Sequence, residues 1–196
     1  MSFAGVREGM RVVAADGLTL EPQVARHAEA MFEVLSDPAI YEHENQPPPS
    51  IEWLRERFAK LESRRSPDDS EQWLNWVVRL PTSELIGYVQ ATVLPNGEAS
   101  IAYELASAYW GHGLAYRAVR AMLDELSVRY GVGRVRAVFK SGNHRSMRLL
   151  ERLGFVLASR DAHLARDVEP GERLMELGLR SAGKPRDPKD IPLLTQ

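Results

Sequence analysis

Apolar side chains change their spacing along the chain, and these changes predict its elements. Over residues 24–35 and again over 51–64 they have helical spacing, which predicts one helix in each segment. Asp37-Pro38 ends the first helix, and a proline run that closes on Ser50 separates the two and caps the second. A short leucine-rich strand over 18–21 precedes both helices.

The rest of the chain is richer in strands. Three consecutive strand-like segments are expected at residues 73–80, 85–94 and 98–105. Helices over 113–130 and 143–153 then alternate with strands over 134–139, 155–159 and 174–179. Consecutive strands predict an antiparallel meander, whereas strand–helix–strand steps predict parallel pairing. We therefore expect a mixed α/β (α+β) sheet in one domain over residues 1–182, followed by a polar, proline-containing tail over 183–196.

Composition narrows the class of protein. The 196 residues are 44% hydrophobic and 27% charged, which is typical of a globular domain and excludes wholesale disorder. The absence of cysteine excludes disulfides, thiolate metal sites and cysteine nucleophiles, and we expect no metal site. No apolar run reaches the roughly 18 residues of a membrane span, and the N-terminus lacks a signal-peptide core. We expect a cytoplasmic protein without a membrane partner.

The charge is small overall but unevenly placed. A net charge of −2 argues against binding of long nucleic acids. Between Gly111 and Phe155, however, there are nine Lys and Arg residues and only three Asp and Glu residues. Such a basic stretch is typical of a site for one polyanionic ligand, and equally of two amphipathic helices with solvated arginine faces.

The sharpest motif is the run from Trp110 to Ala115, Trp-Gly-His-Gly-Leu-Ala, at a predicted strand–loop–helix junction. Glycines let the backbone approach an anion, and the helix that begins there directs unpaired N–H groups at it. Arg117 and Arg120 add positive charge nearby. The Walker pattern is absent, and the Rossmann pattern would need glycine where Tyr116 stands. The loop predicts a phosphate site, with a turn that holds no ligand as the alternative.

This loop resembles the Q/R-x-x-G-x-G/A acetyl-CoA loop of the GNAT acyltransferases, in the Tyr-Trp-Gly-x-Gly-x-Ala form common in their RimJ/RimL branch. Residues 143–155, NHRSMRLLERLGF, are similar to the family's N-x-x-S-x-x-x-x-E-x-x-G-F segment. Asp37-Pro38 and Gly87 also match the branch, so the resemblance covers about residues 18–159. It implies the GNAT fold, which has a mixed, mostly antiparallel sheet, a splayed central pair of parallel strands, and helices on both faces.

The resemblance also implies acetyl-CoA as the cofactor, with its pantetheine arm between the strands at 100–105 and 134–139. Backbone groups of Leu105 and Ser107 and the amide of Asn143 are expected to contact it. The residues expected to hold its phosphates are Trp110, Gly111, His112, Gly113, Leu114, Ala115 and Arg117. Many family members carry a tyrosine seven residues after the asparagine as the acid for the leaving thiolate. Leu150 stands there, so that mechanism is excluded.

The implied reaction is direct transfer of an acetyl group to a primary amine in a ternary complex, which needs a base and an acid. Glu104, at the end of a strand that faces the thioester, is the first candidate base; the alternative is a solvated strand residue. His43, Glu44 and His163 are weaker candidates. Ser146 is the candidate acid, and the alternative is a serine that bonds its own helix.

The sequence says less about the acceptor amine than about the cofactor. Residues 24–53 and the loop 161–171 are expected to line the acceptor cleft. The segment from Glu21 to Gln72 contains twelve acidic and six basic residues. This balance favours a cationic peptide or small-molecule amine: a protein N-terminus, an aminoglycoside or a polyamine. Trp53, Trp73 and Trp76 would line the cleft or belong to the core. A non-catalytic acyl-CoA-binding or regulatory module, a nucleotide-binding domain and a homodimer remain open.

Overall fold

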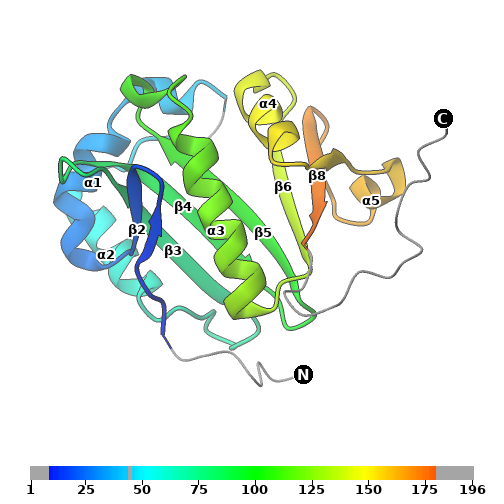
Figure 1. Ribbon diagram of the computed structural model, residues 1–196, viewed down its shortest axis with the longest axis horizontal. Coiled ribbons are helices and arrows are strands. Elements are labelled where there is room, and N and C mark those ends of the chain that lie inside the picture. The colour runs from blue at the N-terminus through cyan, green and yellow to red at the C-terminus, as the bar shows by residue number, and fades with distance from the viewer. Residues whose placement is uncertain (1–8, 44–45, 180–196) are drawn as a thin grey trace, which may run out of the picture.

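A computed structural model describes residues 9–43 and 46–179, so the expected tail over 183–196 lies outside them. One eight-stranded sheet runs through the described chain in the order β1-β2-β3-β4-β5-β6-β8-β7 (Figure 1). Its strands are β1 (Val13–Ala15), β2 (Leu18–Pro22), β3 (Gln72–Arg79), β4 (Leu85–Val93), β5 (Glu98–Leu105), β6 (Arg134–Lys140), β7 (Val156–Leu157) and β8 (Glu172–Gly178). The α-helices are α1 (Ala28–Leu35), α2 (Ile51–Leu61), α3 (Leu114–Tyr130), α4 (His144–Arg152) and α5 (Arg160–Leu164). The short 3-10 helices are η1 (Ala25–His27), η2 (Pro38–Tyr41) and η3 (Ser107–Tyr109).

The expected mixed sheet is confirmed: all pairings in it are antiparallel except that of β5 with β6. This parallel pair is joined only at its beginning, where residues 98–100 meet residues 134–136. Both strands continue, β5 to Leu105 and β6 to Lys140, without pairing further. The splayed central pair that the resemblance implies is therefore present, and it opens toward the start of α3 and of α4 (Figure 1).

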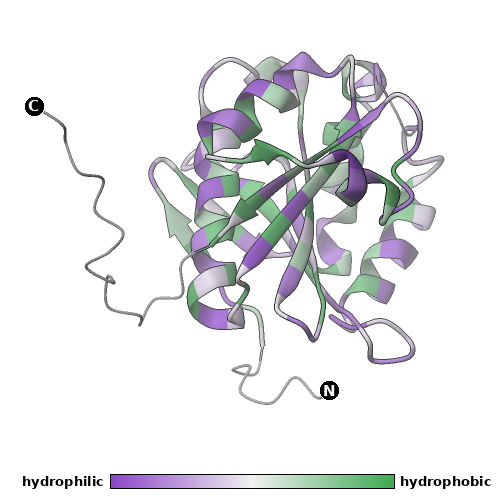
Figure 2. Ribbon diagram, turned by 90° about the vertical axis from the view of Figure 1, so that its right-hand side faces the viewer, coloured by the Kyte–Doolittle hydropathy of each residue, from purple (hydrophilic) through white to green (hydrophobic). Residues whose placement is uncertain are grey.

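Helices cover both faces of the sheet. The long helix α3 crosses one face of the sheet (Figure 1). There Val119, Met122 and Leu126 pack against side chains from the central strands in the larger core. Helices α1 and α2 cover the other face with a smaller core that includes Met31 and Phe58. Hydrophobic and hydrophilic residues both occur along the strands (Figure 2), and where helices cover both faces the buried run is continuous, as over residues 74–78 of β3. No helix in the described part of the chain is long and apolar enough to cross a membrane.

The predicted elements are largely found, and the differences concern short ones. The strand β1 is not predicted, and helix α5 lies where a loop is expected. The strand expected over 155–159 shrinks to the two residues of β7 at the sheet edge. Elements of two to five residues carry little periodicity of their own and depend on tertiary pairing, which explains these errors.

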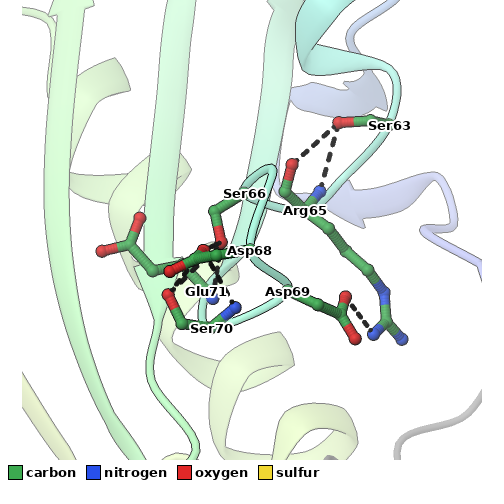
Figure 3. A network of polar contacts seen from close by, with 7 residues as sticks. All are labelled: Ser63, Arg65, Ser66, Asp68, Asp69, Ser70 and Glu71. Carbon is green, nitrogen blue, oxygen red and sulfur yellow. Dashed lines mark hydrogen bonds and ion pairs between the residues drawn. The ribbon is translucent and has the colours of Figure 1, made fainter.

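The loop between α2 and β3 is held by its own side chains (Figure 3). Ser66 Oγ and Ser70 Oγ donate to Asp68 Oδ1 at 2.6 and 2.8 Å, which lowers the pKa of Asp68 to about 2. Just before the loop, the carbonyl of Arg64 accepts the amide of Trp73 at 2.8 Å, and its guanidinium donates to the carbonyl of Gln23. These contacts fix the chain where it enters β3 below α2.

Candidate active site

A cleft of about 760 Å³ begins where β5 and β6 separate and continues beneath α1 and α2. At one end it is bounded by the glycine loop and the first turns of α3 and α4. At the other end its floor is the sheet and its roof is α2. The cleft thus joins a region suited to a phosphate with a region enclosed by the N-terminal helices.

The glycine loop has the conformation that its sequence predicts. Gly111 and Gly113 have φ angles of 79° and 73°, in the left-handed region that glycine adopts without strain. A Cβ atom at either position would meet nothing within 4 Å, so this side of the loop is open. The amide of Arg117 makes the first helical bond, to the Gly113 carbonyl at 3.1 Å. The amides before it face the opening without a helical acceptor, as an anion site requires.

Trp110 fixes the loop to the end of β5. Its indole Nε1 donates to the Leu105 carbonyl at 2.8 Å, and the guanidinium of Arg145 stacks 4.4 Å from its ring centroid. The side chain that replaces the family's usual Gln or Arg therefore anchors the loop.

The structure brings most of the expected cofactor residues to the cleft. Those that line it are Leu105, Trp110, Gly111, Gly113, Leu114, Ala115 and Asn143. Ser107, His112 and Arg117 do not line it. The Ser107 amide instead donates to Asp37 Oδ2 at 2.6 Å, and the Arg117 guanidinium donates to the Asp16 carbonyl at 3.0 Å.

The positive charge beside the loop comes mainly from α4, which the sequence analysis did not single out. Arg145, Arg148 and Arg152 line the cleft, and Arg152 stacks 4.9 Å from the centroid of the Tyr116 ring. Their spacing of three and four residues places them on one face of the helix, a signal that was available in the sequence.

The register of the sheet directs unused backbone groups of β5 into the opening. The amide of Ala106 donates to the Ile86 carbonyl, so even-numbered residues of β5 bond to β4. The C=O of Ile101, both backbone groups of Tyr103 and the N–H of Leu105 then face the separated side, where β6 has left the sheet. The Leu105 carbonyl, in contrast, is taken by Trp110. This edge can accept an added extended chain.

Glu104 lines the cleft on the face that α1 and α2 cover. It lies directly opposite Tyr88 of β4. Burial raises the pKa of Tyr88 well above its usual value, and the charge of Glu104 and a hydrogen bond with it raise it further. Burial, then the charges of Glu104 and Asp37, raise the pKa of Tyr41 to about 12. Two tyrosines that stay protonated at neutral pH therefore surround the carboxylate.

Ser146 and Asn143 lie at the start of α4. Asn143 Oδ1 accepts the Ser146 amide at 3.0 Å and caps the helix, which leaves the Asn143 NH₂ group for another partner. Across the opening, burial raises the pKa of Tyr103 to about 12, and the hydroxyl of Ser146 opposes this rise. The buried Tyr103 hydroxyl makes no ordinary hydrogen bond to any described residue. The sequence analysis missed Tyr103, although it is next to Glu104 and lines the cleft.

The three weaker base candidates differ in their position relative to the cleft. His43 lines the cleft, and Glu44 lies outside the described residues. The two ring nitrogens of His163 are both engaged: Nε2 accepts the Leu174 amide at 3.0 Å, and Nδ1 lies 2.9 Å from the Ser159 carbonyl. His163 does not line the cleft.

Several expectations about the acceptor region need correction. No residue of the loop 161–171 lines the cleft, because this segment lies beyond β6 and β8. Of the tryptophans, Trp53 lines the cleft, Trp76 is fully buried, and Trp73 bonds to Glu71. The acids counted between residues 21 and 72 do not form a wall: among the described residues that line the cleft, only Glu104 is acidic.

A family model described as "Acetyltransferase (GNAT) domain" matches residues 17–156, which include the glycine loop, Glu104 and Ser146. The chain belongs to the GNAT acetyltransferase family. The resemblance drawn from the two motifs is thereby confirmed, and the splayed sheet is the fold of this family.

Relatives and solved structures agree with this assignment. The chain is 24% identical over 149 residues to the uncharacterized N-acetyltransferase p20 of Bacillus licheniformis, covering 74% of this chain and 83% of the relative. It superposes with a TM-score of 0.72 and 16% identity on RimL, a ribosomal L7/L12 alpha-N-protein acetyltransferase in complex with coenzyme A, over 86% of this chain and 98% of that one. A spermidine N-acetyltransferase SpeG chimera from Vibrio cholerae and hSSAT gives a TM-score of 0.68 and 21% identity, over 83% and 95% of the two chains.

Proposed function

We propose that this protein transfers an acetyl group from acetyl-CoA to a primary amine, directly and within a ternary complex. The observation that carries the proposal is the placement of Glu104, a carboxylate in the cleft on the part of β5 that has separated from β6. The glycine loop lies at one end of the same cleft and the enclosed region below α2 at the other. A donor and an acceptor can therefore meet at this residue.

The residues present suit acetyl-CoA. The open glycine loop and the start of α3 offer backbone amides to a pyrophosphate, and Arg148 of α4 adds a cation that has no ion pair among the described residues. Tyr103 and Leu105 offer strand-edge groups to a pantetheine arm, and Asn143 offers its amide. When bound, acetyl-CoA supplies the activated acyl group as a thioester.

Glu104 is the proposed base. An amine must lose a proton to attack the thioester carbon, and Glu104 takes that proton on the acceptor side of the sheet. Because Tyr88 stays protonated, it donates to Glu104 and holds the carboxylate in one orientation.

Ser146 is the proposed acid, and we add Tyr103 as its partner. As the carbon–sulfur bond breaks, the Ser146 hydroxyl gives its proton to the leaving sulfur and recovers one from the Tyr103 hydroxyl across the opening. Two observations support this pairing. The buried Tyr103 hydroxyl has no hydrogen-bond partner within bonding distance among the described residues, and Ser146 lowers the pKa of Tyr103 against the rise that burial causes. The two hydroxyls would take over the role of the tyrosine that Leu150 replaces.

Substitution of Glu104 tests the proposal. Glu104→Gln keeps the shape but cannot take a proton at neutral pH, so thiol release with acetyl-CoA and an amine panel should fall by about 10²–10⁴-fold. The affinity for acetyl-CoA, measured by calorimetry, should stay the same. The loss should shrink at high pH, where more of the amine arrives deprotonated. Glu56→Gln, on the exposed side of α2, is the matched control and should leave turnover unchanged.

Two results would contradict the proposal. A loss below about threefold means that Glu104 is not the base. Binding of acetyl-CoA by the unmodified protein without turnover of any amine favours the non-catalytic acyl-CoA-binding module instead.

A further inference from the structure

Three side-chain amides lie in a row on the floor of the acceptor region. Asn75 of β3 is paired directly with Gln90 of β4. The backbone N–H of Gln23 donates to the backbone carbonyl of Asn75 at 2.9 Å, which extends the row past the end of β2. All three residues line the cleft. Gln90 is in turn opposite Ala102 of β5, two residues before Glu104 on the same face. We call Gln23, Asn75 and Gln90 the amide row.

The amide row includes a buried donor that the described residues do not satisfy. Gln23 and Asn75 are buried, with 3% and 4% of their surface exposed. The Gln23 Nε2 atom is buried and makes no hydrogen bond to a described residue, and the side chains of Asn75 and Gln90 line the cleft beside it. A buried amide without a partner is costly, so such groups in a cleft indicate a polar ligand.

The row also has a definite reach. Neighbouring strands are about 4.8 Å apart, so the row spans on the order of 10 Å, comparable to about three residues of an extended chain. Its roof is apolar, since Leu54, Phe58 and Leu61 of α2 line the same part of the cleft. A flat chain with polar edges and apolar side chains would satisfy both surfaces.

The charges in this region disfavour a polycation. Among the described residues that line the cleft, Glu104 is the only carboxylate, and the proposed chemistry uses it. Arg57 of α2 lines the same region, with its guanidinium 5.5 Å from the Trp53 ring centroid, and makes no ion pair to any described residue. A second or third ammonium group of a polyamine would meet this cation and neutral amides in place of anions.

We propose that the amide row is a specificity subsite that binds neutral amide groups in the substituent of the acceptor amine, and that it favours amide-bearing chains over polycations. The inference rests on the proposed function and names the substrate class that the site selects. Gln23 Nε2 donates to a carbonyl of the chain, and Asn75 and Gln90 each donate to and accept from its amide groups.

Substitutions in the row are best tested on acceptors that differ in amide content: the tripeptide amide Ala-Ala-Ala-NH₂, butylamine and spermidine. Gln90→Met and Asn75→Leu keep much of the volume and remove the hydrogen bonds. Each should lower kcat/KM for the tripeptide amide about tenfold and leave butylamine within twofold. Comparing variant with parent for each acceptor cancels differences in the pKa of the amines. Gln90→Glu should raise kcat/KM for spermidine about tenfold, because it adds the missing anion.

Gln72→Met is the matched control. Gln72 is on β3 like Asn75 and is also buried, but it is three residues away on the opposite face and does not line the cleft. Its substitution should leave all three ratios unchanged. Equal losses for the tripeptide amide and butylamine, or a preference for the tripeptide amide over spermidine that survives unchanged in Gln90→Met, would overturn the proposal.

Calorimetry separates this proposal from the proposed function. Titration of the tripeptide amide into the complex with coenzyme A should show binding that weakens about tenfold in Gln90→Met. Such a result supports the subsite even if no amine is turned over, in which case the proposed function alone fails. Binding that is absent in the parent, or unchanged in the variant, overturns the subsite.

Discussion

Gly87 of β4 lies so close to Glu104 of β5 that a Cβ atom on Gly87 would be 2.1 Å from the Glu104 carbonyl oxygen. The same atom would be 2.7 Å from the Leu105 Cα. Only a residue without a side chain allows the two strands to approach in this way. The glycine therefore sets the position of the backbone that carries the proposed base.

The first prediction concerns this contact. Gly87→Ala should push the end of β5 away. The melting temperature should fall, because overpacking of this kind typically costs about 1–3 kcal/mol. Turnover should fall at least tenfold, because Glu104 moves with the strand. Thermal melting and thiol-release assays measure the two effects. Gly133→Ala is the control, since a Cβ there meets nothing within 4 Å. Normal turnover in Gly87→Ala would show that the close approach does not position Glu104.

The second prediction compares two arginines near the glycine loop. Arg148→Glu should weaken acetyl-CoA binding strongly, and the loss should shrink as salt rises, because Arg148 lines the cleft and acts by screened attraction. Arg117→Glu should have the smaller effect, since Arg117 is held by the β1–β2 turn through Asp16. Calorimetry at two ionic strengths makes the comparison. The reverse order would return the phosphate contact to Arg117.

The third prediction concerns the two hydroxyls across the opening. If Ser146 and Tyr103 deliver one proton together, Ser146→Ala and Tyr103→Phe should each lower kcat about tenfold, and the double variant should lose no more than the worse single one. The affinity for acetyl-CoA should change little. Losses that multiply in the double variant would mean that the two residues act independently.

The fourth prediction is a pH dependence. Hydrogen bonds from the Ser107 side chain and amide lower the pKa of Asp37 below its ordinary value of 3.8. A depressed carboxyl pKa stabilises the fold above pH 3.8, and this contribution is lost as the pH falls through the lower, folded value. Asp37→Asn should therefore lower the melting temperature by about 2–4 °C at pH 7 and flatten its decline below pH 4. A parallel decline in both proteins would show that Asp37 is not coupled to folding.

The sequence is a good guide where function and local structure coincide. The glycine loop needs residues that adopt left-handed φ angles at a helix start, and Gly111 and Gly113 are recognisable as such residues from the local sequence alone. The Asn143 cap and the helix after it are equally local, because the cap binds the amide three residues ahead.

Relationships across the sheet are harder to predict. The amide row depends on the register of β3 with β4 and on the end of β2, which are far apart in the chain. The direction of Arg117 depends on a turn about one hundred positions away. The acids near α1 and α2 were counted without knowing which helix face each occupies, so their sum did not describe the cleft.

The separation of β5 and β6 has one more consequence. Exposed strand edges invite pairing with other chains and so promote aggregation, and proteins usually shorten, charge or cover them. Here the two open edges face each other across the cleft, so a strand of another protein could pair with either edge only by entering between β5 and β6. The geometry that admits a thin, flexible substrate therefore also protects the sheet from its neighbours in a crowded solution.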